Sequence, residues 1–241
     1  MSLRRVLIKL SGESLGGATG SGLDASTLER IAREVVDAAN TGIGISIVIG
    51  GGNLFRGADG SLGAVGLSRV TGDHMGMLAT LMNALAFRDV LEARGTPAVV
   101  LSSHPVATVV DGYSVRTSLE HLAAGRVVIH AGGTGNPLFT TDTAACLRGI
   151  ETGADLVVKA TKVDGVYSAD PVADPDAVRF EELTYMEVIE RRLGVMDLTA
   201  VTLCEEHDLP VVIFDITAAG ALTKILRGAK VGTRIWSGRE P

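Results

Sequence analysis

The stretch VVIHAGGTGNPLFTTD, residues 127–142, decides the fold of this chain. Its apolar first part predicts a buried strand, its glycines and hydroxyls predict a loop, and residues 140–142 predict the start of a helix. Glycines let the backbone turn and bring its N–H groups close to a ligand, and a helix start adds unpaired N–H donors. The stretch is therefore typical of an anion-binding loop. An ordinary βα turn with Thr or Asp as its N-cap is the alternative.

The composition around this stretch predicts an α/β protein. Of the 241 residues, 46% are hydrophobic but only 4% are aromatic, and 30 are glycine. Aliphatic strands separated by glycine turns are typical of a parallel sheet that is covered on both faces. We therefore expect a three-layer α/β/α sandwich with a central, mostly parallel sheet. No repeat or linker interrupts the sequence, so residues 1–241 are expected to form a single domain with a soft boundary near Gly153.

Charge and cysteine content exclude several classes of protein. The net charge is −6 and no basic run occurs, which disfavours a nucleic-acid partner. Cys146 and Cys204 are far apart without a CxxC motif, which predicts a reducing compartment and neither a disulfide framework nor a metal site. The apolar start is too short for a signal peptide, and no apolar run has the length of a membrane helix. We expect a cytoplasmic protein without a membrane partner.

Periodicity and turn residues predict the other elements. Strands are expected at 5–10, 43–49, 98–101, 127–131, 156–159, 211–214 and 233–236. Helices are expected at 24–40, 73–93, before Gly125, and at 142–149, 184–192, 196–207 and 221–227. A glycine-rich connection at 57–70 precedes the second helix, and Asp164-Gly165 is predicted to be a hairpin turn. The helix at 73–93 is apolar on nearly all faces, which indicates a central helix or a subunit interface.

Glycine-rich loops follow three of the expected strands, after Leu10, Ile49 and Ala131. In open α/β sheets, ligands bind beyond the carboxyl ends of the strands, where such loops gather. The sequence therefore predicts a site for an extended polyanion or for two anions side by side.

Three charged residues near these loops are candidates for contacts with the ligand. Lys9 ends an apolar strand in a chain where lysine is scarce, which favours a phosphate contact over simple exposure to solvent. Arg56 follows the Gly50–Asn53 run and is placed to bind a second phosphate bidentately, although a lone loop arginine is usually solvated. Asp73 is either a helix cap or an acceptor for ribose hydroxyls.

Common catalytic fingerprints do not occur in the sequence. Without GxxxxGK[ST] the chain is not a P-loop protein, and without GxGxxG a dinucleotide site is disfavoured. HExxH, GxSxG and HRD are also missing. The five histidines have no ligand spacing, so we expect structural roles for them and no protein metal site.

Six motifs together resemble the bacterial uridylate kinases of the amino-acid-kinase superfamily. They are KLSGE at 9–13, GGGNLFRG at 50–57, GDHMGM at 72–77, GTGNPLFTTD at 133–142, KATKVDGVY at 159–167 and VMDL at 195–198. They follow the family's order and span about residues 4–236. The first two alone indicate only the superfamily, while GDHMGM and the 134–141 loop are more specific. The resemblance implies the amino-acid-kinase fold, with a mainly UMP-binding lobe at 1–153 and a mainly ATP-binding lobe at 154–241.

The resemblance also implies which residues bind nucleotides. For ATP they are Lys9, Leu10, Ser11, Gly12, Gly52 and Arg56 around the phosphates, and Thr161, Tyr167 and Asp170 around the adenosine. For UMP they are Gly51, Asp73, Thr134, Gly135, Asn136, Pro137, Leu138, Phe139, Thr140 and Thr141. An activating GTP is expected at Gly17, Ala18, Thr19, Gly20, Ser21 and Gly22. The expected catalytic residues are Lys9, Arg56, Asp142 and Asp197; the two aspartates orient Lys9 or waters, or else only cap helices.

The implied reaction is ATP + UMP giving ADP + UDP, with Mg²⁺ bound mainly through the ATP phosphates. Known members are also inhibited by UTP and assemble as hexamers, so we expect a homohexamer. A phosphate acceptor with a second pKa near ~6 is already a nucleophile at neutral pH, so no general base is required.

Two alternatives remain at the level of the sequence. One is a superfamily kinase that makes an acyl phosphate from glutamate, carbamate or acetylglutamate, and the 134–141 loop argues against it. The other is a non-catalytic nucleotide-binding regulator or storage protein, and Lys9, Arg56 and Asp170 argue against that.

Overall fold

A nine-stranded sheet forms the centre of the protein. The computed structural model describes residues 3–56, 63, 66–171, 173–174 and 176–239. The strand order is β4-β3-β5-β2-β1-β6-β10-β11-β9, and every neighbouring pair is parallel except β10 and β11. The strands are β1 (Arg5–Leu10), β2 (Gly44–Ile49), β3 (Ala98–Ser102), β4 (Asp111–Gly112), β5 (Val127–Ala131), β6 (Leu156–Thr161), β9 (Glu182–Thr184), β10 (Val211–Asp215) and β11 (Thr233–Trp236).

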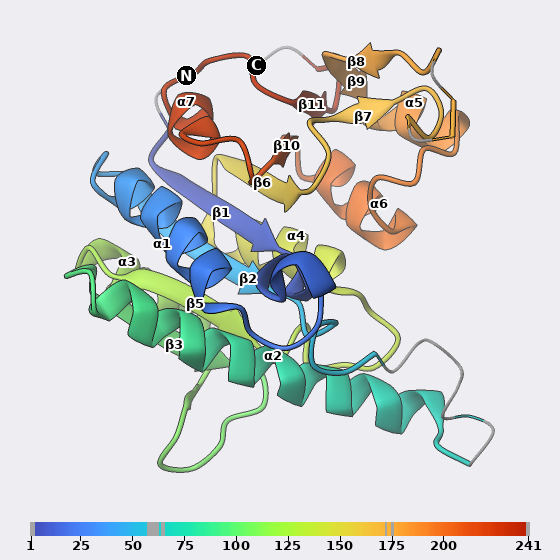
Figure 1. The fold of residues 1–241 in the computed structure, drawn as a ribbon. Helices are drawn as coiled ribbons and strands as arrows, with labels where there is room; N and C mark the ends of the chain where they lie inside the picture. Colours follow the sequence, from blue (N-terminus) through green and yellow to red (C-terminus); the bar gives the residue numbers. More distant parts are fainter. Residues whose placement is uncertain (1–2, 57–62, 64–65, 172, 175, 240–241) are drawn as a thin grey trace.

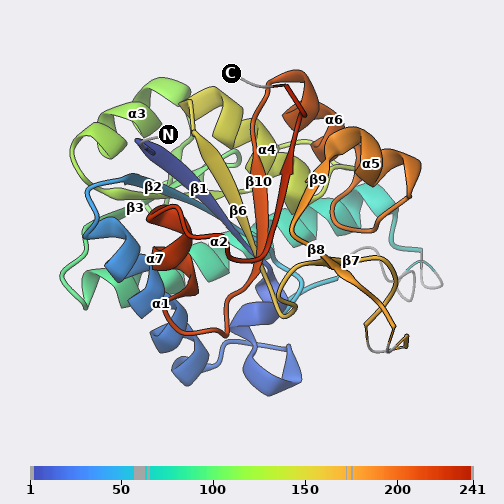
Figure 2. The same cartoon turned by 90° about the horizontal axis from the view of Figure 1, so that it is seen from above.

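Helices cover both faces of this sheet (Figures 1 and 2). On one face lie α1 (Ala25–Ala39), α2 (Arg69–Glu92) and α7 (Ala221–Leu226). On the other lie α3 (Val115–Ala123), α4 (Thr141–Thr152), α5 (Tyr185–Glu190) and α6 (Leu198–Glu206). Two 3₁₀ turns, Gly12–Leu15 and Gly17–Thr19, follow β1. The predicted three-layer sandwich with a mostly parallel sheet is confirmed.

The alternation of side chains along the strands explains why both faces are covered. In β1, Val6 and Ile8 pack with α1 and α7, whereas Leu7 packs with α4. Successive residues of a strand point to opposite faces, so a strand that is apolar throughout must have helices on both sides. Lys9 has the same parity as Leu7, and the sheet therefore directs it toward α4.

Two helix ends differ from the predicted ones because of the residues that cap them. Helix α2 begins at Arg69 rather than 73, because the Ser68 side chain accepts a hydrogen bond from the Thr71 N–H and caps an earlier turn. Helix α4 continues past 149 to Thr152 and ends where Gly153 adopts a left-handed conformation with φ of 63°. Most of the glycine-rich connection at 57–70 lies outside the described residues.

The predicted hairpin turn at Asp164-Gly165 is wrong. Strand β7 (Val166–Tyr167) pairs antiparallel with β8 (Arg179–Phe180), not with β6. Gly165 is required by close packing, because a Cβ there would lie 2.5 Å from the Thr233 hydroxyl oxygen. The short strands β4, β7, β8 and β9 were not predicted. Among the described residues, no helix is both long and apolar enough to cross a membrane.

Candidate active site

Two lysines and one aspartate form the centre of the site. Lys9 of β1 pairs in register with Lys159 of β6, so both side chains lie on the face that α4 covers. Asp142, in the first turn of α4, lies between them. Its Oδ1 is 2.7 Å from the Lys9 Nζ, and its Oδ2 is 2.6 Å from the Lys159 Nζ. Two ammonium groups and one carboxylate leave a net positive charge beside a helix N-terminus, which favours an anion.

Burial and charge shift the pKa values of this cluster. Burial by itself raises the pKa of Asp142, but the charges of Lys9 and Lys159 outweigh it and hold that pKa below its usual value. Burial lowers the pKa of Lys159, and the charge of Asp142 partly offsets this effect. Lys159 also donates to the carbonyl of Val195 at 2.5 Å, which anchors its ammonium group from a second side.

The turn after β2 contains Gly50, Gly51 and Gly52 and is called the glycine turn below. It packs closely against Gly12, which follows β1. A Cβ on Gly12 would lie 2.7 Å from the Gly50 carbonyl oxygen and 2.5 Å from the Asn53 Oδ1, so only glycine fits there. Asn83, which is fully buried in α2, donates to the Gly50 carbonyl at 2.7 Å and to the Asn53 Oδ1 at 2.7 Å. This pair of amides fixes the turn that places Gly51 and Gly52 at the site.

The loop from Gly132 to Thr140 ends in a capped helix. The Thr140 hydroxyl accepts hydrogen bonds from the N–H groups of Asp142 and Thr143, and it donates to Asp197. Asp197 also accepts from the Thr143 hydroxyl at 2.9 Å and caps α6 through the Ala200 N–H. Asp197 therefore ties α4 to α6, whereas Asp142 is the aspartate that contacts Lys9.

Asp73 joins the start of α2 to this loop. Its Oδ2 accepts a hydrogen bond from the Leu138 N–H at 2.8 Å, where Leu138 adopts a φ of 73°. Its Oδ1 forms an ion pair with Arg69 at 2.8 Å. Arg56 on the opposite side forms an ion pair with Glu13 at 2.7 Å, and its side chain is 56% exposed. Each arginine is therefore paired with one carboxylate near the surface of the site, and Arg56 also donates to the Gly52 carbonyl at 3.2 Å.

These residues surround a hollow of about 560 Å³. Ten of the predicted site residues line it: Lys9, Ser11, Gly12, Gly51, Gly52, Arg56, Asp73, Phe139, Thr140 and Thr141. Phe139 is half exposed at its edge. The side chain of Leu10 is fully buried in the core, so only its backbone is available to a ligand. Residues 134–138 of the loop are not among the residues that line the hollow, and Asp142 contacts Lys9, which does line it.

The predicted adenosine residues lie outside this hollow. Thr161 ends β6, two residues beyond Lys159, and its hydroxyl donates to the Val163 carbonyl at 2.6 Å. The Tyr167 hydroxyl donates to Asp164 at 2.6 Å, and this hydrogen bond raises the pKa of Tyr167. Asp170 lies further along the same connection, and its carbonyl accepts from the Asp174 N–H. Thr161 is thus the last residue of β6, and Tyr167 and Asp170 follow the carboxyl end of that strand.

The predicted GTP segment, 17–22, lies next to the glycine turn without lining the hollow. The Gly22 N–H donates to the Asn53 carbonyl at 2.9 Å, and the Asn53 side chain donates to the Gly22 carbonyl at 2.6 Å. The segment and the turn that carries Gly51 and Gly52 are therefore connected through one residue.

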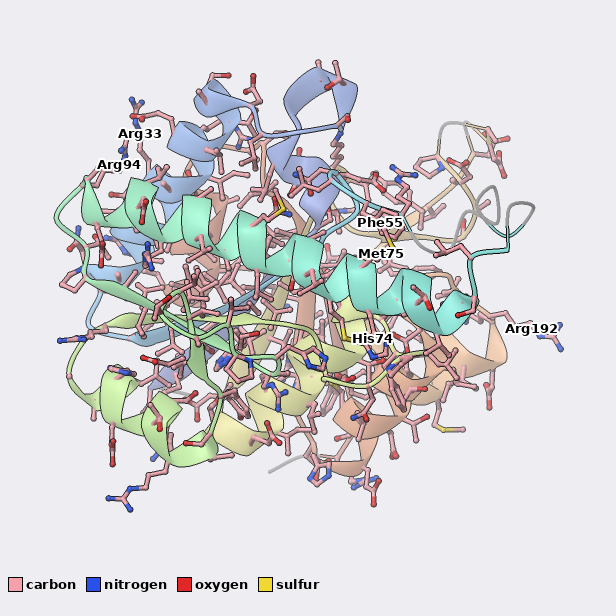
Figure 3. All side chains as sticks on the ribbon, turned by 90° about the horizontal axis from the view of Figure 1, so that it is seen from below. Arg33, Phe55, His74, Met75, Arg94 and Arg192 are labelled. Carbon is pink, nitrogen blue, oxygen red and sulfur yellow. The ribbon has the colours of Figure 1, made fainter. Side chains whose placement is uncertain are left out.

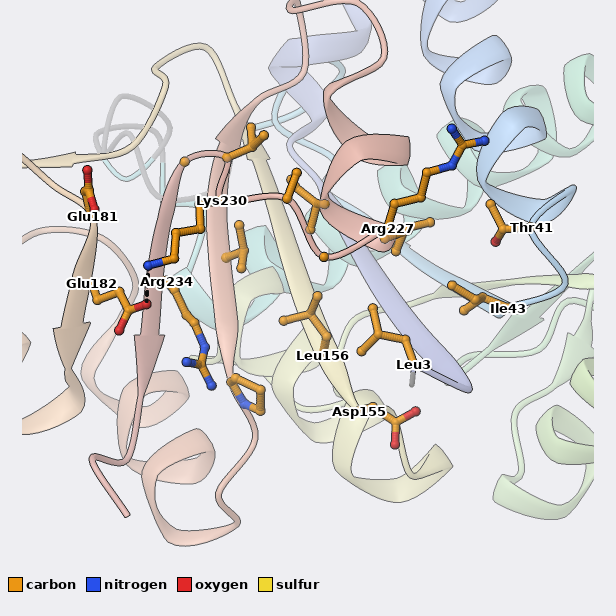
Figure 4. A pocket seen from close by; sticks show the side chains of 18 of the residues that line it. Leu3, Thr41, Ile43, Asp155, Leu156, Glu181, Glu182, Arg227, Lys230 and Arg234 are labelled. Carbon is orange, nitrogen blue, oxygen red and sulfur yellow. Dashed lines mark ion pairs between the residues drawn. The ribbon is translucent and has the colours of Figure 1, made fainter. Parts of the chain in front are cut away.

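A second hollow, of about 910 Å³, lies at the opposite ends of the strands (Figure 4). It is lined by the starts of β1, β6 and β10 and by the turn between α7 and β11, and Lys230 faces Glu182 across it at 4.0 Å. None of the predicted site residues lines it. Since ligands of parallel sheets bind at the carboxyl ends of the strands, its larger size does not make it the active site.

Comparison with known proteins identifies the family. The profile described as the amino acid kinase family matches residues 4–215. The chain belongs to the amino acid kinase family. Among relatives in this family, the uridylate kinase of Ectopseudomonas mendocina (strain ymp) is 56% identical over 232 residues, which cover 96% of this chain and 93% of that protein. The uridylate kinase of Legionella pneumophila (strain Paris) is 54% identical over 233 residues, covering 97% and 94%.

Solved structures of the amino acid kinase family have the same fold. The UMP kinase from Bacillus anthracis superposes with a TM-score of 0.95 at 36% identity, covering 99% of this chain and 98% of that one. The UMP kinase from Ureaplasma parvum gives a TM-score of 0.90 at 31% identity, covering 98% and 100%. The family and the fold expected from the six motifs are confirmed.

Several residues at this candidate site were not predicted from the sequence, and Lys159, Asn83 and Arg69 are three of them. Lys159 is not among the predicted site residues, although it ends a predicted strand just as Lys9 nearly does, which is a signal in the sequence. Asn83 is a buried amide within an apolar helix, and such a group requires partners. Arg69 precedes Asp73 by one helical turn, but the predicted helix begins at residue 73 and therefore does not include Arg69.

Proposed function

We propose that this protein transfers the γ-phosphoryl group of MgATP to UMP and so produces ADP and UDP for pyrimidine nucleotide synthesis. The observation that supports it best is the position of Lys9. It lies at the edge of a single hollow, between a glycine turn and the N-terminus of α4. Two anion-binding features on either side of one ammonium group suit a reaction between two phosphates.

The proposed binding modes follow this arrangement. The ATP phosphates lie against Lys9, Ser11, Gly12, Gly52 and Arg56, with the Leu10 backbone beside them and the adenosine near Thr161, Tyr167 and Asp170. UMP lies against Gly51, Asp73 and residues 134–141. On this proposal residues 1–153 mainly bind UMP and residues 154–241 mainly bind ATP.

Catalysis on this proposal depends on positioning and charge. The UMP phosphate attacks the γ-phosphorus directly, and Lys9 and Arg56 stabilise the charge on the transferring group. Asp142 holds Lys9 in place through its ion pair. Mg²⁺ enters as part of the substrate, on phosphate oxygens and water. This suits the described residues, where no cluster of acidic, histidine or cysteine side chains could hold a metal and Asp142 is neutralised by two lysines.

The proposed substrate can be tested with a panel of acceptors. We expect ADP release from MgATP with UMP, and CMP and dUMP in the same assay measure how far the site discriminates by base and by sugar. Glutamate and carbamate should give no turnover, because neither carries a phosphate for the loop and the α4 N-terminus to hold. A coupled assay for ADP measures all five. Turnover with a carboxylate acceptor, or silence with every acceptor, would overturn the proposal.

We also propose that the chain forms a homohexamer and uses α2 in its assembly. Met75, Leu78 and Met82 are 38%, 51% and 59% exposed, and their spacing places them along one side of α2. Figure 3 shows this helix lying across the outside of the molecule, with Met75 labelled. Leu78→Asp should therefore yield a smaller species by sedimentation, while Leu198→Asp on α6, which is 64% exposed, should not. Equal masses for all three proteins would contradict the role of α2.

We also propose how the enzyme is regulated and where in the cell it is located. GTP is proposed to activate through residues 17–22, whose hydrogen bonds to Asn53 connect them to the glycine turn. UTP is proposed to inhibit, and initial rates with each nucleotide added test both effects. A cytoplasmic location is supported by the two cysteines, which are free and buried.

A further inference from the structure

A buried arginine outside the hollow contacts the loop that the proposed function assigns to UMP. Arg148 lies on α4, further along the helix that begins at the site, and its side chain is only 6% exposed. One guanidinium nitrogen pairs with Glu151 at 2.6 Å, and the guanidinium carbon lies 3.8 Å from the centre of the Tyr113 ring. A second guanidinium nitrogen donates to two groups outside α4, the Ser103 hydroxyl at 2.9 Å and the Gly133 carbonyl at 3.3 Å.

Ser103 completes this contact from the end of β3. Its hydroxyl accepts from Arg148 and donates to the same Gly133 carbonyl at 3.0 Å. Its own N–H donates to the Ala131 carbonyl at 3.1 Å, so the serine is itself fixed to β5. The Gly133 carbonyl thus receives two donors, one of them charged.

These hydrogen bonds set the direction of one peptide group. Gly133 lines the hollow and has a φ of 59°, which glycine adopts without strain. In a planar trans peptide the carbonyl and the next N–H point in opposite directions. With the Gly133 carbonyl held by Arg148 and Ser103, the Thr134 N–H is directed away from them. On the other side, the Gly132 N–H donates to the Thr80 hydroxyl at 2.8 Å, so the loop is anchored to α2 as well.

The burial of Arg148 needs an explanation beyond stability. A buried charge is costly to desolvate, and apolar residues of similar volume often stabilise a protein as well or better. Arg148 is buried, whereas the side chain of its partner Glu151 is 28% exposed. Here the guanidinium contacts Tyr113, Glu151 and Ser103, and its charge adds to the effect of burial in lowering the pKa of His130. The Arg148 guanidinium is buried despite the free energy of desolvating it, and it donates to the Gly133 carbonyl. It is therefore suited to hold the loop in one conformation.

We propose that Arg148 and Ser103 are positioning residues for the acceptor nucleotide. They fix the peptide between Gly133 and Thr134, so that the loop is organised before UMP binds and less free energy is spent in ordering it. The inference rests on the proposed function, because it assigns the loop to UMP. It predicts that weakening these contacts raises KM for UMP and leaves KM for ATP unchanged.

Ser103→Ala is the decisive variant, because it removes one hydroxyl and leaves Arg148 and Glu151 paired. We expect KM for UMP to rise about fivefold, which is the effect of one lost hydrogen bond, with KM for ATP within twofold of wild type. Arg148→Lys keeps the charge but not the forked geometry and should raise KM for UMP about tenfold. Ser118→Ala is the matched control, because Ser118 is a buried serine whose hydroxyl has no partner among the described residues.

Calorimetric binding of UMP alone and the melting temperature complete the test. Weaker UMP binding by Ser103→Ala, at a melting temperature close to that of Ser118→Ala, supports the positioning role. A lower melting temperature with both KM values unchanged, or an equal rise of both KM values, would overturn it. If the wild type does not phosphorylate UMP at all, the proposed function fails first, and this outcome is distinct from an active wild type with an unaffected variant.

Discussion

Replacing Lys9 by alanine should reduce kcat by about 10²–10³-fold while changing the dissociation constant of UMP by less than about threefold. Lys9 is 7% exposed and is directed into the hollow, where the proposed reaction joins two phosphates. Its ammonium group is needed most when charge spreads over the transferring phosphoryl group. UMP itself is assigned to Asp73 and the 134–141 loop, which the substitution does not touch. Initial rates and calorimetric titration with UMP measure the two effects.

The fold should survive this substitution. Without Lys9, Asp142 remains paired with Lys159 at 2.6 Å, so the buried cluster changes from a net positive charge to neutrality. Lys230→Ala is the control, because the side chain of Lys230 is 85% exposed and lies at the opposite ends of the strands. It should leave both kcat and UMP affinity at wild-type values. Equal losses of turnover and UMP binding in Lys9→Ala would remove Lys9 from its assigned role.

The elements that the sequence predicted well are those whose apolar pattern is continuous. β1 and β5 have the predicted ends, because each is a largely apolar run bounded by polar or glycine residues. β11 also has the predicted ends, but its sequence TRIW is mixed, and the residues that mark it are Gly232 before it and Ser237 after it. The start of α2 was missed because one serine, Ser68, decides it and no apolar residue marks it. β7 and β8 were missed because their pairing joins segments separated by a polar connection, and such pairing has no local signal.

The residues of the site also fall into those that local sequence features predict and those that depend on long-range packing. Glycine turns and the helix N-terminus are local features, so the sequence indicated where anions would lie. The partner of Lys9 is not a local feature. Asp142 and Asp197 are equivalent candidates in the sequence. In the structure α4 packs over β1 and β6 and brings Asp142 to Lys9, whereas α6 packs against α4 and brings its N-cap Asp197 to Thr143. The Arg148 contact depends on the same long-range packing, because it joins α4 to the end of β3.

Asp142→Asn should lower the free energy of unfolding at pH 7 by about 3–5 kcal/mol, because it leaves two buried ammonium groups without a counter-charge. Turnover should also fall by at least tenfold, since Lys9 loses the group that holds it. The surface control Asp208→Asn, at a side chain that is 55% exposed, should change stability by less than about 1 kcal/mol. Urea unfolding followed by circular dichroism gives both free energies.

The stability difference should also depend on pH with a defined sign. The pKa of Asp142 is lowered in the folded state, so its contribution is present above the unfolded value of about 3.9 and is lost as the pH falls through the lower folded value. The difference in the free energy of unfolding between the wild type and Asp142→Asn should therefore become smaller below about pH 4.

A second substitution tests whether repulsion between the ammonium groups of Lys9 and Lys159 destabilises Asp142→Asn. Adding Lys159→Met to Asp142→Asn removes one of the two facing ammonium groups, so the double variant should recover stability without recovering turnover. If the double variant is no more stable than Asp142→Asn, repulsion between Lys9 and Lys159 is not what the carboxylate relieves. If it regains turnover as well, Asp142 does not position Lys9 for the reaction, and the ion pair at the start of α4 serves the fold alone.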